Sequence, residues 1–287
     1  MPTVGSPTVK RRRLAAALRR HRDQAGLTLE EVAGQLEWSP GKISRIENAR
    51  VSVLPRDVKY LLRVYGTTEG EPEWDSLLTL AQESREKGWW HAYGNAIPEL
   101  LETYVGLEAT ASSVRGYEPE TVPALLRTEG YCRALARALA PRASGEQIRR
   151  QAEVCLARQE RLAGPGGPRL HLVLSEAALR RAVGGPDVMR GQLAQLADVS
   201  QRPAVTLQVL PFSAGAHAAM DGAFTILGFP DPADPPVVCV PYYTGLLYLE
   251  KPAEAEGYAA VFDRVRAAAL PAGPSRDLIA GVAAGLG

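Results

Sequence analysis

The sequence has few cysteines and no long apolar run, and both absences limit what the protein can be. The three cysteines, Cys132, Cys155 and Cys239, are odd in number and far apart along the chain. This spacing argues against a disulfide framework or a clustered zinc site, predicts no metal or other cofactor, and fits a reducing cytoplasm. No run approaches the roughly 18 apolar residues of a membrane span, and residues 1–13 lack the apolar centre of a secretory signal. We therefore expect a cytoplasmic protein with no membrane partner.

Length and hydrophobic content predict a folded chain with two domains. The chain has 287 residues, which is long for one core, and 46% of them are hydrophobic. We expect a first domain over residues 1–66, with 1–9 flexible, and a larger domain over 89–287. Between them, 67–88 should form a connecting helix, because its apolar residues follow helical spacing.

A net charge of +1 hides an unequal distribution of charge along the chain. Residues 1–66 contain 13 lysines and arginines against 6 acidic residues, a net charge of +7, so the remainder carries −6. A basic segment ahead of an acidic body is typical of a nucleic-acid-binding module fused to another domain. A solvated charged surface is the alternative explanation.

Residues 10–65 carry the start and stop signals of four helices. Gly26 ends the first, and Thr28 with Glu31 has the spacing of a capping box at the start of the second. Ser39 caps the third, whose first residue is Pro40. The second and third helices are short and separated by three residues, which predicts a helix-turn-helix.

Small and apolar residues at fixed spacing predict that these two helices lock against each other. The pattern consists of Ala33, Leu36, Trp38, Ile43 and Ile46. Glu37 stands in the turn where glycine is usual, so a positive φ there would cost about 1 kcal/mol.

The outward face of the third helix is predicted to enter the major groove of double-stranded DNA. Arg45 is the main candidate for a bidentate contact with guanine. The N–H groups at the start of the second helix are natural phosphate ligands. The predicted DNA contacts are Thr28, Leu29, Ser39, Gly41, Lys42, Ser44, Arg45, Asn48 and Arg50, and Lys10, Arg11, Arg12 and Arg13 form either further backbone contacts or a solvated basic tail. A helical bundle used for protein contacts is the alternative.

The stretch "AGLTLEEVAGQLEWSPGKISRIENARVSV" resembles the lambda-repressor-like (XRE-type) helix-turn-helix regulators, and "SRIE" is its most recognisable part. The chain departs from them at Leu29, where many members have a base-contacting glutamine, and at Ala49, where glycine commonly ends the helix. We expect operator binding as a homodimer, because one such helix reads only a few base pairs.

The rest of the chain mixes predicted strands and helices. Expected strands are 111–117, 170–174, 205–210, 224–229, 237–241 and 246–249, and expected helices are 125–139, 145–162, 186–200, 253–269 and 275–286. The last three strands follow one another through short turns, which favours a mostly antiparallel sheet. The predicted fold is thus an all-α helix-turn-helix bundle followed by a larger α+β domain.

No spacing of ionisable residues in this larger domain predicts catalysis, so we expect that the protein is not an enzyme. The loop 211–222 holds His217 and Asp221 and is either a binding loop or a packed structural loop. Trp90 and His91 are candidates for an apolar ligand pocket, with core packing as the alternative.

Several stretches in this domain, "VTLQVLPFSAGAHAAMDGAFTILGFP" among them, resemble in their order the C-terminal domain of the WhiJ-like and antitoxin-like regulators of actinomycetes. Typical members have Gly and Gln where this chain has Ala124 and Arg127; if these positions line a family site, its specificity differs here. The resemblance implies a transcription repressor whose large domain binds a small neighbour-encoded protein or a small-molecule effector. The competing interpretations are an antitoxin that binds DNA for autoregulation and an enzyme with a DNA-binding head.

Overall fold

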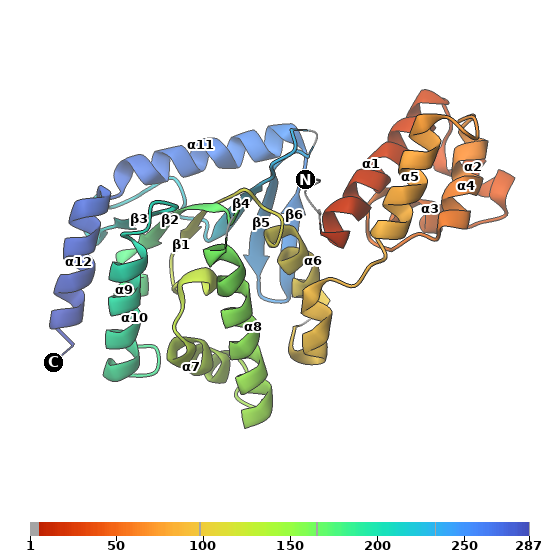
Figure 1. Cartoon of the computed structure of the whole chain (residues 1–287). Helices are drawn as coiled ribbons and strands as arrows, with labels where there is room; N and C mark the ends of the chain where they lie inside the picture. The colour runs from red at the N-terminus through yellow and green to blue at the C-terminus, as the bar shows by residue number, and fades with distance from the viewer. Residues whose placement is uncertain (1–5, 98, 165, 233, 287) are drawn as a thin grey trace. The chain divides into compact units, whose positions relative to one another are not determined.

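The computed structural model describes residues 6–97, 99–164, 166–232 and 234–286, and the chain divides into two units, Met1–His91 and Ala92–Gly287. The first unit contains α1 (Pro7–Gln24), α2 (Leu29–Leu36), α3 (Pro40–Glu47), α4 (Pro55–Val64) and α5 (Pro72–Glu83) (Figure 1). Ser6, Thr28 and Ser39 cap the first three helices by accepting a backbone N–H. Proline is the first residue of α4 and of α5. Its missing N–H costs nothing there, because an N–H in the first turn has no acceptor within the helix.

The apolar faces of these five helices share one core. It includes Leu18, Val32, Ile43, Leu61 and Trp74, each almost fully buried. The segment 67–88, expected to be a connecting helix, contributes α5 to this core, where the helix packs against α1 and α4. Its apolar stripe is therefore part of the helical unit itself.

The expectation that residues 1–9 are flexible is wrong for residues 6–9. Residues 1–5 lie outside the described residues, whereas 6–9 form the cap and first turn of α1. The Ser6 hydroxyl accepts the N–H of Val9 at 3.4 Å, and Val9 is buried. The cap and the burial together order this turn.

In the described part of the second unit, six strands form one sheet in the order β3-β2-β1-β4-β5-β6. The strands are β1 (Ser113–Glu118), β2 (Arg169–Ser175), β3 (Val205–Leu210), β4 (Phe224–Gly228), β5 (Val237–Tyr242) and β6 (Gly245–Leu249). The α+β fold is confirmed, and the sheet is mixed. β1, β2 and β3 are parallel, because helices form the crossovers between them, whereas β4, β5 and β6 follow one another through short loops and pair antiparallel.

Helices cover both faces of this sheet (Figure 1). One face packs on α11 (Pro252–Ala268), with Tyr117, Val173 and Phe262 in the shared core. The remaining helical elements are η1 (Trp89–Ala96), α6 (Glu99–Glu108), η2 (Ala124–Leu126), α7 (Glu129–Leu139), α8 (Gly145–Ala163), α9 (Glu176–Arg180), α10 (Pro186–Val199), η3 (Phe212–Ala214) and α12 (Ala272–Ala284).

The single helix expected over 125–139 is divided in the structure. The short turn η2 ends at Leu126, and α7 begins after Thr128, whose side chain accepts the N–H of Tyr131. An N-cap of this kind starts a new helix, so η2 and α7 are separate elements. The break matters because η2 lines the cavity described below.

Candidate functional site

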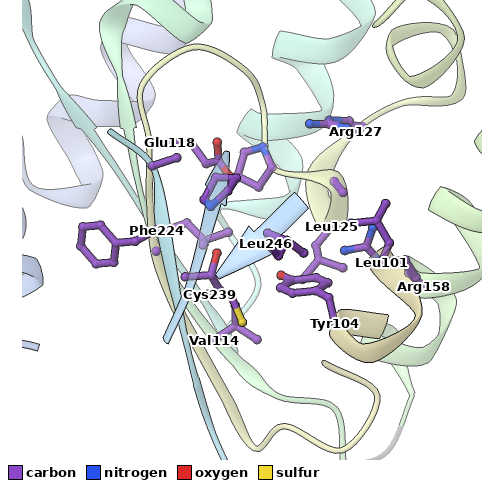
Figure 2. Close-up of a pocket in the computed structure, with 17 residues that line it drawn as sticks. Leu101, Tyr104, Val114, Glu118, Leu125, Arg127, Arg158, Phe224, Cys239 and Leu246 are labelled. Carbon is purple, nitrogen blue, oxygen red and sulfur yellow. The ribbon is translucent and has the colours of Figure 1, made fainter. Parts of the chain in front are cut away.

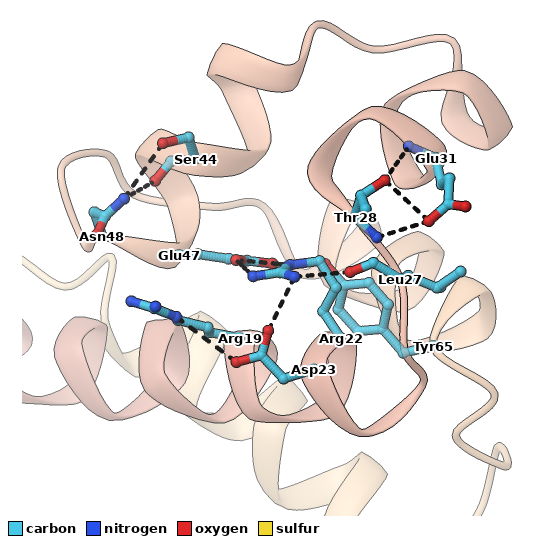
Figure 3. Close-up of polar contacts among 10 residues, drawn as sticks. All are labelled: Arg19, Arg22, Asp23, Leu27, Thr28, Glu31, Ser44, Glu47, Asn48 and Tyr65. Carbon is cyan, nitrogen blue, oxygen red and sulfur yellow. Dashed lines mark hydrogen bonds and ion pairs between the residues drawn. The ribbon is translucent and has the colours of Figure 1, made fainter.

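The turn between α2 and α3 has the geometry that the sequence predicts. Thr28 and Glu31 form a complete capping box, and hydrogen bonds from the N–H and hydroxyl of Thr28 lower the pKa of the Glu31 carboxyl (Figure 3). Glu37 adopts the left-handed conformation, with φ 55° and ψ 35°, and Trp38 donates its N–H to Ala33 O at 2.9 Å. The structure thus places a non-glycine residue in a strained turn.

The exposed face of α3 displays Arg45. Ile43 and Ile46 are buried on the opposite face, whereas Arg45 is exposed and, within the described residues, its guanidinium has no polar partner. Gly41 lies one turn before it and is also exposed, so a groove could approach the backbone there. Arg50 follows the helix and is exposed as well.

Two other predicted base or phosphate contacts are engaged inside the protein. Lys42 Nζ lies 3.1 Å from Asp57 Oδ2 and 3.2 Å from the centre of the Trp38 ring. Asn48 donates its side-chain amide to Ser44 O at 2.7 Å and to Ser44 Oγ at 3.3 Å, which closes the end of α3 (Figure 3). These contacts orient Lys42 and hold Asn48 and Ser44 to their own helix.

The remaining predicted DNA contacts lie at helix starts. The N–H groups of Leu29 and Glu30, at the exposed start of α2, have no acceptor in the part of the chain that the structure describes, so they are available to a phosphate. Ser39 is exposed and caps α3 through the N–H of Lys42. Lys10, Arg11, Arg12 and Arg13 belong to α1 and do not form a tail, and Lys10 pairs with Glu83 at 3.2 Å.

A buried polar cluster behind α3 escaped the sequence analysis. Arg22 on α1 contacts both carboxylate oxygens of Glu47, and Tyr65 donates its hydroxyl to the same carboxylate at 3.0 Å (Figure 3). Burial, together with the negative charge of Glu47, raises the pKa of Tyr65. Arg22 and Glu47 are 25 positions apart in the sequence. Capping motifs and helical periodicity relate only residues a few positions apart, so they could not predict this ion pair.

In the second unit, a cavity of about 150 Å³ lies between the sheet and the elements α6, η2 and α8 (Figure 2). Its floor comes from the sheet face opposite α11, with Val114, Leu172 and Cys239. Gly116 also lines it, and a side chain there would approach Phe224 O to 3.0 Å. The cavity lies where the parallel strands β1 and β2 meet the antiparallel strands β4 and β5.

Glu118 supplies a carboxyl group to this cavity, at the end of β1. Burial raises its pKa to about 7, an effect that the positive charge of Arg127 partly offsets. Within the described residues, no hydrogen-bond donor is paired with this carboxyl. Arg127 lines the same cavity (Figure 2). Its guanidinium donates to Val122 O at 2.6 Å and to Thr121 Oγ1 at 3.3 Å.

Amide side chains from two helices hold the cavity wall at 124–128 in place. Gln159 of α8 donates to Ala124 O at 2.9 Å and to Arg127 O at 2.8 Å. Gln192 of α10 donates to Leu126 O at 2.7 Å and accepts the N–H of Thr128 at 2.8 Å. Ala124 and Arg127, singled out by the sequence comparison, thus both line the cavity.

Arg158 also faces this cavity, but its charge is already compensated. Its Nε and Nη2 each lie 2.7 Å from a carboxylate oxygen of Glu108, and both residues are largely buried. The guanidinium also lies 5.5 Å from the centre of the Tyr104 ring. Glu118 and Arg127 are therefore the ionisable groups that a small ligand could engage.

The other residues suggested as partner or ligand contacts do not line this cavity. His217 lies 3.3 Å from the Tyr117 hydroxyl and accepts the N–H of Ala219 at 3.2 Å, contacts that support the loop itself. Asp221 is exposed on that loop. Trp90 is buried beside Trp89, and His91 is exposed with Nδ1 3.1 Å from Gly88 O.

Two of the three cysteines, although far apart along the chain, lie together in the fold. Cys132 on α7 and Cys155 on α8 are buried side by side, with their Sγ atoms 2.6 Å apart. The two helices pack against each other, and this brings together residues that the chain separates by 23 positions. Cys239 lies apart from this pair in sequence, on β5.

The described residues contain neither a cluster of three or more metal-ligating side chains nor a helix long and apolar enough to cross a membrane.

The fold and the first site define a helix-turn-helix protein with an additional α+β domain. Comparison with known families agrees: a helix-turn-helix domain family matches residues 13–74. A second family, described as a domain of unknown function (DUF5753), matches residues 101–281, more than half of the chain, so this chain belongs to that family. The comparisons with curated proteins and with solved structures found no match.

Proposed function

We propose that the chain is a sequence-specific transcription regulator, acting as a repressor, that binds a palindromic operator as a homodimer. The observation that carries this proposal is Arg45, displayed on the outward face of α3 beside the exposed backbone of Gly41. Lys42 and Asn48 on the same helix are held by intramolecular contacts. Arg45 therefore supplies direct readout of a base, and the amides at the start of α2 supply phosphate contacts.

Selection of bound DNA duplexes from a random pool tests this proposal. The full chain should enrich one palindromic sequence, and light scattering of the complex should give two chains per duplex. The Arg45→Ala chain should lose the preference at one position in each half-site. Failure to enrich any sequence would show that the helix-turn-helix serves another purpose.

We further propose that the second unit is a non-catalytic effector domain whose ligand occupies the cavity at Glu118. The cavity combines an apolar floor with a carboxyl that is paired with no donor among the described residues, and the Arg127 guanidinium lies on its wall. A buried carboxyl is stabilised by a donor or a positive charge. The ligand class that fits is a small apolar molecule with an amine or a similar hydrogen-bond donor.

Thermal-shift measurements with matched small aliphatic amines, alcohols and carboxylates test the ligand class. Amines should raise the melting temperature of the chain, and the Glu118→Gln variant should not respond. Equal responses to all three classes would leave Glu118 without a role in binding. If a co-purifying small protein releases the operator while small molecules do not, the partner is a protein instead.

A further inference from the structure

Two thiols meet in the second unit at a distance shorter than ordinary non-bonded contact. Cys132 Sγ and Cys155 Sγ lie 2.6 Å apart, and both side chains are buried. The sulfurs of a disulfide are separated by about 2.05 Å. The two side chains are therefore close enough for a disulfide to join them.

The surroundings make the two thiols unequal. The hydrogen bond from Cys132 lowers the pKa of the Cys155 thiol, and the nearby charges of Arg158 and Arg127 lower it further. The same hydrogen bond, with burial, raises the pKa of Cys132. Gln159 Nε2 adds a contact to Cys155 Sγ at 3.6 Å. Cys155 is thus the thiol of the pair that loses its proton more readily, and Cys132 is the thiol held against it.

Small solutes have a route to the pair. Both cysteines line a second cavity, of about 290 Å³, enclosed by α6, α7 and α8. Leu101 and Leu139, at its border, are 37% and 76% exposed. The cavity is wide enough for a hydroperoxide, which is little larger than water. Leu101, Ala124, Arg127 and Arg158 also line the cavity at Glu118, so the two spaces share a wall.

We propose that Cys132 and Cys155 form a redox-active pair that hydrogen peroxide converts into an intramolecular disulfide. The Cys155 thiolate attacks the peroxide, the O–O bond breaks, and a sulfenic acid and one hydroxide form. Cys132 then attacks the Cys155 sulfur, and the hydroxyl leaves as water with the thiol proton. Two electrons pass from the sulfurs to the peroxide, which ends as water. This chemistry is independent of the proposed DNA binding and of the amine ligand.

Oxidation would alter the wall that the two cavities share. In the reduced protein, Cys155 donates its thiol to Ala124 O at 3.1 Å, and Gln159 donates to the same oxygen at 2.9 Å. The disulfide removes the first of these bonds and ties α7 to α8 covalently. The redox state of the pair therefore acts on η2, whose residue Ala124 faces both cavities.

Titration of thiols in the full chain, before and after treatment with hydrogen peroxide, tests the proposal. The denatured reduced chain should contain three reactive thiols, and the oxidised chain only one. The mass should fall by about 2 Da, the two hydrogens lost in the disulfide. Proteolysis should yield a linked pair of peptides that contain Cys132 and Cys155, and dithiothreitol should restore all three thiols.

Matched variants separate this pair from nonspecific oxidation. Cys239→Ser should still lose both remaining thiols, whereas Cys132→Ser should retain a sulfenic acid at Cys155 that dimedone labels. Three thiols that persist after peroxide treatment, or a peptide link through Cys239, would overturn the proposal. The result with the unsubstituted chain decides the question even if a variant fails to fold.

Discussion

Arg22 on α1 and Glu47 at the end of α3 form a largely buried, bidentate ion pair. Arg22 Nε lies 2.9 Å and 3.0 Å from the two carboxylate oxygens, and Nη2 adds a bond of 3.0 Å. The side chains are 12% and 3% exposed, so the pair lies largely out of water. Because Arg45 is two residues before Glu47, the pair also fixes the direction in which α3 presents Arg45.

Replacing Glu47 with alanine should strongly destabilise the helical unit. The change leaves the Tyr65 hydroxyl without its acceptor and removes one of the two carboxylates beside Arg22, which keeps Asp23 at 2.9 Å and Leu27 O at 2.8 Å. Breaking a buried pair costs about 3–5 kcal/mol, and the remaining partners of Arg22 place this change at about 3 kcal/mol. The four tryptophans of the chain, Trp38, Trp74, Trp89 and Trp90, all precede residue 92. Denaturant unfolding followed by tryptophan fluorescence therefore measures the free energy of unfolding of this unit.

The exposed pair between Arg63 and Glu69 is the matched control for this measurement. Its two side chains are each 57% exposed, and the nitrogen–oxygen distance is 3.1 Å. Glu69→Ala should change the free energy of unfolding by about 1 kcal/mol at most. Equal effects of the Glu47 and Glu69 substitutions would contradict the role assigned to burial.

Glycine in place of Glu37 should stabilise the same unit. Glu37 has φ 55°, and this left-handed conformation costs a residue with a Cβ roughly 1 kcal/mol more than glycine. We expect Glu37→Gly to raise the free energy of unfolding by about 0.5–1 kcal/mol, measured in the same fluorescence assay. Gln35→Gly, on an exposed position inside α2, should lower it by about 0.5–1 kcal/mol.

Local signals explain which parts could be predicted from the sequence. The capping residue Thr28, the proline at position 40 and the strained turn at Glu37 act within a few residues, and each is in place. The bonds of Lys42 to Asp57 and of Arg22 to Glu47 join separate helices, so no spacing rule reveals them.

The cavity and the cysteine pair depend on tertiary structure in the same way. Glu118, Arg127 and Arg158 come from a strand, a loop and a helix that converge only after the crossovers between β1 and β2 have packed. The resemblance to known regulators pointed to Ala124 and Arg127 as positions where this chain differs, and both residues line the cavity.

The stability of the second unit should fall as the pH rises through the titration of Glu118. Its folded-state pKa is about 7, above the ordinary value of 4.5, so the folded chain holds a proton that the unfolded chain releases. Stability from this group is complete below pH 4.5 and is lost by about pH 8. Because the carboxyl is partly exposed, the loss is about 1–3 kcal/mol.

Glu118→Gln should remove this dependence, because an amide does not titrate. Thermal unfolding monitored by circular dichroism at pH 5.5 and pH 8 compares the two chains, and the difference between the pH values should be larger for the unsubstituted chain. Glu120→Gln is the control, since Glu120 is exposed on the loop after β1. Identical pH profiles for Glu118→Gln and the unsubstituted chain would rule out the raised pKa.

Substitutions on α3 should separate base readout from phosphate contact. Arg45→Ala should weaken binding to the selected operator by about 1–3 kcal/mol and leave binding to random duplexes much less affected, since a bidentate contact with guanine carries sequence information. Lys42→Ala should weaken binding to both duplexes by similar factors, because it removes a positive charge and leaves the Asp57 carboxylate without its lysine partner. Fluorescence anisotropy titrations at two salt concentrations measure both effects. Equal losses on operator and random DNA for Arg45→Ala would assign this arginine to the phosphate backbone.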